Sequence, residues 1–195
     1  MRLFLAGPLP DALQAEVFSL LTAARRAAPQ ARWVRPGQLH LTLAFLGELE
    51  ASLVPALLEA LQPVALRHGA VQLWLRGAGG FGRPRQPDVL YAGLAGDVEA
   101  LRALQADVQQ ALRPWAAAAT EAADSPFRPH LTLARARARH GDAALGRCMR
   151  SLREQLFGHF LLDKLVLFQS QLGPAGARHT PLAEFALASA AVAQV

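Results

Sequence analysis

The stretch Leu39-His40-Leu41-Thr42-Leu43 decides the fold, because a second copy, His130-Leu131-Thr132-Leu133, stands 90 residues further along the chain. Successive side chains of a β-strand point to opposite faces, so residues two positions apart share a face. The leucines, together with Phe45, are therefore expected to face a core. Each histidine and the threonine two residues later are expected on the other face, roughly 7 Å apart. This pattern predicts two equivalent strands of antiparallel sheets that have one buried face.

The repeat extends beyond the two short motifs. A single His-x-Thr pair is usually the half-exposed face of an ordinary strand, because threonine is a good strand former. Here Leu3–Gly7 and a helical pattern from Asp11 precede the first motif, and Val89–Gly93 and a helical pattern from Asp97 precede the second. Gly7 and Gly93 stand 33 and 37 residues before the two histidines. The similar spacing predicts two pseudo-symmetric lobes.

The segment between residues 77 and 85 is rich in glycine and carries Phe81, Arg83 and Arg85. Its glycines predict a flexible loop after a strand that ends at Leu75. Such a loop is either an ordinary hairpin connection or a substrate contact, because a ring can stack on a base and arginine can hold phosphate. Phe81 and Arg83 are therefore candidate substrate-binding residues.

The C-terminal part of the chain is expected to contain one helix and two closing strands. The helix is expected from Asp142 to Leu156, and the strands at Phe160–Gln171 and Leu182–Leu187. Residues 165–168 are apolar on both faces of the first closing strand, which predicts a central position in its sheet.

The composition is that of a globular chain, with 195 residues, 52% hydrophobic and 18% charged, and we expect a single domain of two intertwined lobes over residues 1–195. The formal charge is +5, and every basic residue except Lys164 is arginine, which favours an anionic partner. Cys148 is the only cysteine, so an intrachain disulfide is excluded. Because signal-peptide and membrane-spanning patterns are absent, we expect a cytoplasmic protein without membrane association. We also expect a monomer.

Two histidines and two threonines on facing strands suit phosphodiester chemistry. Histidine titrates near neutrality, so one imidazole can accept a proton while the other donates one. Threonine hydroxyls can donate hydrogen bonds to non-bridging phosphate oxygens, and a protonated histidine adds positive charge. No metal or other cofactor is expected, because two histidines are too few ligands for a typical zinc site and neither motif contains Asp, Glu or Cys. The sequence contains no P-loop, dinucleotide-binding fingerprint or Gly-x-Ser-x-Gly elbow.

The chain resembles the two-histidine phosphoesterase superfamily, and within it the RNA 2′,3′-cyclic phosphodiesterases, also called 2′-5′ RNA ligases. The resemblance rests on the opening Arg2–Ala6, on Trp33-Val34, on the first motif with the following Phe45-Leu46-Gly47-Glu48, and on Phe127–Arg135 around the second motif. It runs nearly from end to end. It implies an α+β fold of two pseudo-symmetric lobes, each an antiparallel sheet with helices on the outside, and an active-site groove between the lobes.

The resemblance also implies an activity and roles for individual residues. Relatives of this kind open a 2′,3′-cyclic phosphate at an RNA end to a 2′-phosphate, and weak reverse ligation is a further expectation. His40 is expected to protonate the leaving 3′ oxygen and His130 to activate water, although the near symmetry makes the two roles easy to exchange. Thr42 and Thr132 are expected to hold the phosphate.

Residues near the motifs add further candidates. Arg128 and Arg135 flank the second motif and are candidates for additional phosphate or RNA contacts. Relatives often carry a tyrosine before the last strand, where this chain has Arg178-His179-Thr180-Pro181. If that tyrosine seats the base or ribose, the substrate preference of this chain differs, and His179 is a candidate to take its place.

Two other functions remain open at this stage. A two-histidine enzyme could act on small cyclic or 2′-5′ linked nucleotides in place of RNA ends, and the sequence does not distinguish these substrates. A non-catalytic RNA-binding module could also have kept the groove. The intact state of both motifs argues against that module, because loss of a histidine or threonine would be expected in it.

Overall fold

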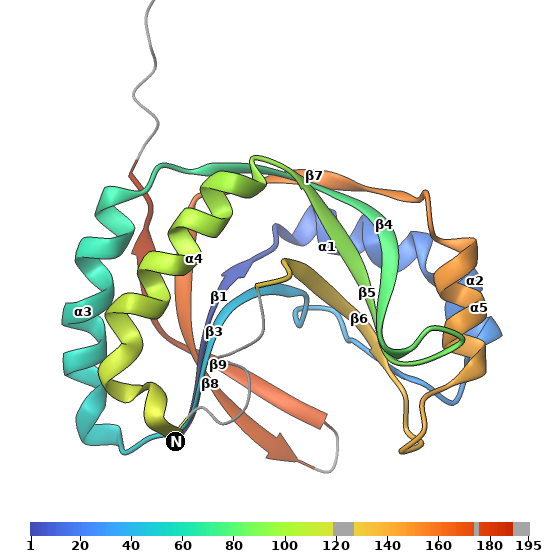
Figure 1. The fold of residues 1–195 in the computed structure, drawn as a ribbon, viewed down its shortest axis with the longest axis horizontal. Coiled ribbons are helices and arrows are strands. Elements are labelled where there is room, and N and C mark those ends of the chain that lie inside the picture. The colour runs from blue at the N-terminus through green and yellow to red at the C-terminus, as the bar shows by residue number, and fades with distance from the viewer. Residues whose placement is uncertain (119–126, 174–175, 189–195) are drawn as a thin grey trace, which may run out of the picture.

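The computed structural model describes residues 1–118, 127–173 and 176–188. Within these ranges the strands form two antiparallel sheets that lie side by side (Figure 1). The first sheet has the order β3-β1-β8-β9, with β1 Arg2–Pro8, β3 His40–Glu48, β8 Lys164–Gly173 and β9 Gly176–Ala186. The second has the order β2-β6-β5-β4-β7, with β2 Arg32–Trp33, β4 Val71–Arg83, β5 Gln86–Gly96, β6 His130–Arg135 and β7 Leu156–Leu162. Each sheet therefore carries one His-x-Thr motif, as the prediction of an α+β fold with two pseudo-symmetric lobes requires.

The helices cover the outer sides of the two sheets, and the chain crosses repeatedly between the halves (Figure 1). α1 (Asp11–Leu20) contacts β7, and α2 (Thr22–Ala27) contacts α5 (Ala143–Ser151), which lies on β4 and β5. α3 (Val54–Arg67) contacts β9, and α4 (Val98–Leu112) contacts both α3 and β3. Short 3₁₀ helices occupy Ala51–Leu53 and Arg113–Ala118. α1 and α4 therefore each follow a strand of one sheet and contact a strand of the other.

The apolar face of α4 shows why this sequence forms a helix against a sheet. Leu101, Leu104, Val108 and Leu112 recur at helical spacing, and all four are buried. They belong to one cluster of buried apolar side chains that contains residues of both sheets. Burial of each leucine contributes roughly 1.5–3 kcal/mol to the hydrophobic free energy of folding. This shared core holds the two motif-bearing sheets against each other.

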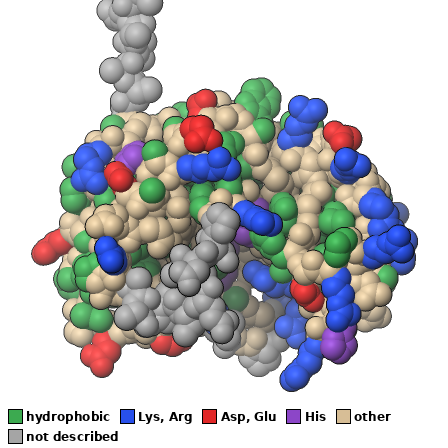
Figure 2. Space-filling model, viewed as in Figure 1, with side chains coloured by type: hydrophobic (Ala, Val, Ile, Leu, Met, Phe, Trp, Pro, Cys, Tyr) green, Lys and Arg blue, Asp and Glu red, His purple; other side chains and the backbone are tan. Residues whose placement is uncertain are grey.

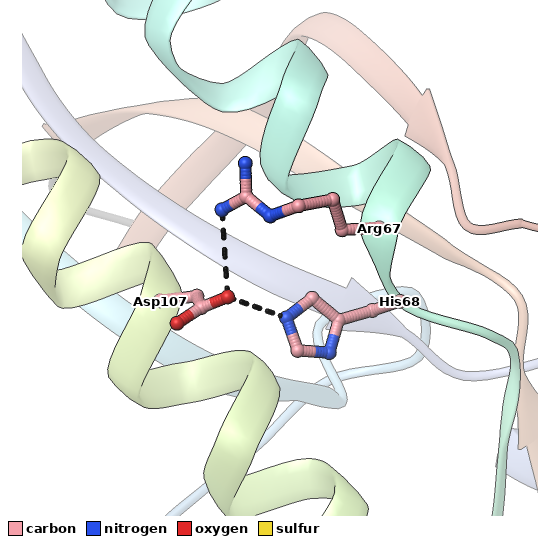
Figure 3. Close-up of polar contacts among 3 residues, drawn as sticks. All are labelled: Arg67, His68 and Asp107. Atoms are coloured by element: carbon pink, nitrogen blue, oxygen red, sulfur yellow. Dashed lines mark hydrogen bonds and ion pairs between the residues drawn. The ribbon is translucent and has the colours of Figure 1, made fainter.

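A polar cluster joins the C-terminal end of α3 to the body of α4 (Figure 3). His68 is the C-terminal cap of α3, and its Nε2 lies 2.9 Å from Oδ2 of Asp107 on α4. Arg67 Nη2 donates to the same oxygen at 3.4 Å. The hydrogen bond from His68, followed by that from Arg67, lowers the pKa of the Asp107 carboxyl. His68 therefore stands at a helix end, where a cation is mildly favourable.

The expected flexible loop at residues 77–82 is wrong, because this segment continues strand β4 to Arg83. Its glycines allow neighbouring groups to pack closely against the strand, and they do not form the loop between β4 and the next strand. A Cβ atom at Gly79 would overlap the ring of Tyr91, and one at Gly80 would lie 2.8 Å from Pro87. Gly77 has a positive φ of 72°, at the register shift between Leu75 and Ala78. The turn itself lies beyond Arg83.

Two expectations for the C-terminal part also need correction. The helix that begins after Asp142 ends at Ser151, because a turn follows and Leu156 already starts β7. The expected strand Phe160–Gln171 is divided between β7 and β8, which belong to different sheets, so three strands close the fold. The central position expected for residues 165–168 is confirmed, since β8 lies between β1 and β9.

Candidate active site

The two motif strands have the same local geometry. β3 pairs with β1 and β6 pairs with β5, both antiparallel. The register skips one residue in each motif, at Leu43 in β3 and at Leu133 in β6, so each strand has a bulge at the second leucine. The leucines of both motifs are buried, and both histidines and both threonines are half-buried. The predicted alternation is therefore confirmed within each His-Leu-Thr-Leu stretch.

The register also refines the internal repeat. Pro8 lies opposite His40, whereas Gly93 lies opposite His130. The equivalent of Gly93 is therefore Pro8, and the expected match with Gly7 is wrong by one position. Spacing along the chain could not reveal this, because a one-residue offset is visible only in the pairing of the strands.

The expectation that Phe45 faces the core is wrong. Its side chain is 55% exposed, because the bulge at Leu43 reverses the alternation and places Phe45 on the same face as His40 and Thr42. The ring of Phe45 lies 6.2 Å from that of Phe4, which is itself 4.9 Å from the imidazole of His40. In the second motif the equivalent position is occupied by Arg135.

Both imidazoles are held in the same way by the backbone. Nδ1 of His40 lies 2.8 Å from the carbonyl oxygen of Gln38, and Nδ1 of His130 lies 2.7 Å from that of Arg128. A carbonyl can only accept, so Nδ1–H donates and the neutral ring keeps its lone pair on Nε2. Neither Nε2 has a hydrogen-bond partner among the described residues, so each ring has one nitrogen fixed and the other available to a ligand. Arg128 contributes its backbone carbonyl, and its side chain is exposed.

The two motif strands contact each other across the boundary between the sheets (Figure 1). Figure 2 shows a hollow between the two halves of the molecule, bordered by Lys and Arg side chains on the side of α2 and α5. We call this hollow the groove. Electrostatic repulsion from His130 and Arg135 contributes to lowering the pKa of His40, and repulsion from Arg135 contributes to lowering the pKa of His130. The structure thus brings together three of the predicted site residues around one region.

Burial is the largest influence on the proton affinity of both rings. It lowers the pKa of His40 from 6.5 to about 4, against the opposing hydrogen bond to Gln38 and with smaller contributions from His179, Arg135 and His130. Burial and then Arg135 also lower the pKa of His130. Both imidazoles are therefore mainly neutral at pH 7 when the groove holds no anion.

The low pKa of His40 predicts a pH-dependent stability. Because the folded protein holds the proton less tightly than the unfolded chain, the His40 contribution is complete above pH 6.5 and is lost as the pH falls toward 4. We expect this loss to be about 3 kcal/mol in the free energy of unfolding. Urea unfolding of the wild type and of His40→Gln measures the free energy of unfolding above pH 6.5 and near pH 4. The decrease between the two pH values should be smaller in His40→Gln than in the wild type by that amount. The same acid loss in both proteins would contradict this explanation.

Aromatic rings surround each histidine. The imidazole of His130 lies 4.8 Å from the ring of Phe81 in an edge-on arrangement and 5.3 Å from that of Tyr91. The predicted contact residue Phe81 is therefore beside a motif histidine. Arg83 lies further along the same strand, at the exposed turn between β4 and β5. Sequence reasoning missed Tyr91, whose only signal was a lone tyrosine in an otherwise apolar strand.

The ring of Tyr91 lies over the backbone of Gly79, and this contact predicts a clear stability effect. A methyl group at Gly79 would overlap the ring, so Gly79→Ala is expected to lower the free energy of unfolding by about 1–3 kcal/mol. In a Tyr91→Ala background the same change should cost much less. Urea unfolding of the four proteins of this double-mutant cycle measures the coupling.

Gly69→Ala is the matched control for this cycle. The nearest neighbour of a Cβ atom there is a backbone oxygen at 3.9 Å, an ordinary contact distance. We therefore expect little loss of stability from Gly69→Ala. An equal cost of Gly79→Ala with and without the tyrosine ring would show that Tyr91 is not the group it meets.

His179 lies beside the first motif and within the last strand, because β9 begins at Gly176 and not at the expected Leu182. Its ring is 5.4 Å from that of His40 and nearly perpendicular to it, and 4.9 Å from that of Phe4. Its Nδ1 atom is buried without a hydrogen-bond partner among the described residues. Burial lowers the pKa of this imidazole as well. Whether it replaces the tyrosine of relatives in function stays a prediction.

Two glutamines were not recognised from the sequence, although they shape the approach to His40. Gln14 is the buried polar residue among the described part of the chain, and its Oε1 accepts from the N–H of Gly37 at 3.0 Å. Gln38 Nε2 donates to the carbonyl of Ala177 at 2.6 Å. These bonds fix the turn that precedes β3 and link it to β9. Only the tertiary contacts reveal these roles.

The described residues contain no group of three or more His, Cys, Asp and Glu side chains that could hold a metal ion. In the same part of the chain, none of the helices has the length and apolar character needed to cross a membrane.

The fold and the paired motifs define the class of protein. A sequence profile described as the 2′-5′ RNA ligase superfamily matches residues 9–174, and the chain belongs to this superfamily. The RNA 2′,3′-cyclic phosphodiesterase of Thermus thermophilus is 33% identical over 192 residues, 96% of this chain and 90% of the relative. The protein of that name from Aeropyrum pernix is 30% identical over 160 residues, 80% of this chain and 86% of the relative. The chain is accordingly a member of the RNA 2′,3′-cyclic phosphodiesterase family.

Solved structures agree with this assignment. A crystal structure of a Thermus thermophilus protein is similar with a TM-score of 0.76 and 31% identity, covering 97% of this chain and 100% of that chain. The Escherichia coli protein LigT in complex with ATP has a TM-score of 0.70 and 26% identity, covering 96% of this chain and 98% of that chain. LigT has also been crystallised with 3′-AMP and with phosphate. The bilobal arrangement of two antiparallel sheets is therefore a shared fold.

Proposed function

We propose that this protein hydrolyses RNA ends that carry a 2′,3′-cyclic phosphate and converts them to 2′-phosphates. The observation that carries the proposal is the pair of imidazoles on adjacent strands. Each has Nδ1 bonded to a backbone carbonyl and Nε2 available to substrate. Two such nitrogens around one phosphate supply the proton acceptor and the proton donor that cleavage needs.

The reaction is an in-line displacement at phosphorus. His130 Nε2 takes a proton from water, whose oxygen forms a bond to phosphorus. The bond between phosphorus and the 3′ oxygen breaks, and His40 Nε2–H gives that oxygen its proton. The product has a 2′-phosphate and a free 3′ hydroxyl. The same displacement, with the 5′ hydroxyl of a second RNA attacking phosphorus in place of water and the 3′ oxygen again leaving, would form a 2′-5′ linkage, which we propose as a weaker activity.

The electrostatics of the free protein support this use of histidine. Burial keeps both rings mainly neutral, so the acceptor is ready before substrate binds. The negative charge of a cyclic phosphate raises the proton affinity of any imidazole beside it. The donor therefore gains its proton together with the substrate. In this proposal His40 is the donor and His130 the acceptor, and a substrate with a sulfur leaving atom distinguishes this assignment from the reverse one.

Other polar groups bind the phosphate and the nucleotide. Thr42 and Thr132 share a face with the two histidines, and their hydroxyls donate to the non-bridging oxygens. Arg135, whose charge reaches both imidazoles, adds a guanidinium suited to phosphate. Phe81 offers a ring for base stacking beside His130. Arg83 and Arg128, both exposed, are assigned to the RNA backbone further from the reacting phosphorus.

Hydrolysis of a short RNA ending in a 2′,3′-cyclic phosphate tests the proposal, with EDTA present and the product separated by chromatography. We expect turnover to the 2′-phosphate at a rate that EDTA does not change. Turnover of small cyclic or 2′-5′ linked nucleotides alone would replace the proposal with the second function. Binding of RNA without turnover of any of these compounds would replace it with the RNA-binding module.

A further inference from the structure

A cavity of about 310 Å³ opens next to His40, outside the groups that perform the proposed reaction. Its lining includes Arg35 and Gln38 from the turn before β3, and Arg178 and His179 from β9. Two contacts join it to the reaction site. The carbonyl of Gln38 accepts the hydrogen bond from His40, and the ring of His179 lies 5.4 Å from that of His40.

The walls of this cavity are fixed by hydrogen bonds. Gln38 Oε1 accepts from the N–H of Arg35 at 3.3 Å, while Gln38 Nε2 donates across the cavity wall to Ala177 at 2.6 Å. Gly37 donates to the buried Gln14, whose Nε2 in turn donates to the carbonyl of Leu9 at 3.1 Å. The turn that carries Arg35 is therefore held against β9, which carries Arg178.

The charge of the cavity is positive. Arg35 comes from the turn before β3 and Arg178 from β9, neither is buried, and neither takes part in an ion pair within the described residues. Among the described residues, the cavity lining contains no carboxylate side chain. Two guanidinium groups that no anion of the described chain neutralises form a site suited to phosphate, which arginine can bind through two parallel hydrogen bonds.

We infer that this cavity binds the phosphate on the 5′ side of the terminal nucleotide of the RNA. The inference rests on the proposed function. In a chain that ends in a 2′,3′-cyclic phosphate, every other phosphate lies on the 5′ side of the terminal ribose. His40 is the proposed donor to the 3′ oxygen of that ribose, so the ribose lies on the His40 side of the reacting phosphorus. The cavity is on this side as well.

The inference assigns a substrate class to the protein. The preferred substrates are oligoribonucleotides, or nucleosides that carry a 5′-phosphate in addition to the cyclic phosphate. A nucleoside 2′,3′-cyclic phosphate without the 5′-phosphate leaves Arg35 and Arg178 unoccupied and binds more weakly. Because the contact is made equally before and during the reaction, the difference is expected in KM more than in kcat.

The test compares two substrates that differ by one phosphate, namely a nucleoside 2′,3′-cyclic phosphate with and without a 5′-phosphate. We expect the wild type to prefer the phosphorylated compound by about tenfold or more in kcat/KM. The Arg35→Ala/Arg178→Ala double variant should lose most of this preference, and Arg35→Lys/Arg178→Lys should keep part of it. The preference should also decrease as the salt concentration rises. The same preference in wild type and alanine variant would overturn the inference.

Arg102→Ala is the matched control, because Arg102 lies on α4, is paired with Glu99 at 2.8 Å and is not part of the cavity. It should leave the ratio of the two kcat/KM values unchanged. If the wild type hydrolyses neither compound nor a short RNA ending in a 2′,3′-cyclic phosphate, the proposed function fails, and titration with a short 5′-phosphorylated RNA still tests the cavity. Binding weakened about tenfold by the double alanine variant, and not by Arg102→Ala, would retain the phosphate site. Equal binding by the wild type, the double alanine variant and Arg102→Ala would contradict a phosphate site in the cavity.

Discussion

His130→Ala and His40→Ala are each expected to lower kcat for hydrolysis of an RNA 2′,3′-cyclic phosphate by about 10²–10⁴-fold, the usual contribution of a positioned acid or base. Each change removes the one nitrogen that the backbone leaves free at its motif. The double variant should be little slower than the worse single variant, because groups that act in one step are not additive. Initial rates at saturating substrate measure this effect.

A substrate with sulfur in place of the 3′ bridging oxygen separates the two histidine roles. A thiolate leaves without needing a proton, so the variant that lacks the acid should regain most of its rate on this substrate. We expect recovery in His40→Ala and none in His130→Ala. Recovery in His130→Ala alone would reverse the assigned roles. No loss of rate in either variant on the oxygen substrate would contradict the two-histidine mechanism itself.

Removal of a threonine hydroxyl is expected to have the next largest effect. Thr42→Val and Thr132→Val keep the size and branching of the side chain but remove the donor to a phosphate oxygen. We expect kcat to fall by about 10²–10³-fold for each, as for other donors that stabilise charge in a transition state. KM should change much less. Steady-state kinetics on the RNA cyclic phosphate, with both parameters resolved, make the measurement.

Thr22→Val provides the control for the threonine variants. Thr22 begins α2, and its hydroxyl donates to the carbonyl of Phe18 at 3.4 Å on the exposed surface. This substitution should leave kcat unchanged. A loss of the same size in all three variants would indicate a general effect of valine on the protein. An increase in KM alone in Thr42→Val or Thr132→Val would assign the hydroxyl to binding of the ground state.

The sequence was sufficient to predict the two motif strands and their pseudo-symmetry. The reason is physical, because alternating leucines in β3 and β6 have a period that only a half-buried strand satisfies. The apolar stripe of α4 was predictable in the same way, because its buried residues recur at helical spacing. Sequence alone could not reveal the bulges at Leu43 and Leu133, which depend on pairing with β1 and β5. The exposure of Phe45 follows from one of these bulges and was therefore mispredicted.

Tertiary contacts account for the other differences. The glycines of β4 have the composition of a loop, but Gly79 accommodates the ring of Tyr91 from the next strand. Gln14 and Gln38 have no local pattern that distinguishes them from surface glutamines, and their partners Gly37 and Ala177 are distant in the chain. Sequence periodicity reports which face of an element is buried. It does not report which distant residue completes a cavity.

The central claim is that His40 and His130 act on one phosphate. NMR of the protein with ¹⁵N-labelled histidine, titrated with a nucleoside 2′-phosphate, tests it most directly, because the product should bind without turnover. The account predicts that the Nε2 signals of both histidines move along one saturation curve with a single dissociation constant. It also predicts that the pKa of each ring rises on binding, from about 4 in the case of His40. Movement of only one histidine, or two different dissociation constants, would contradict it.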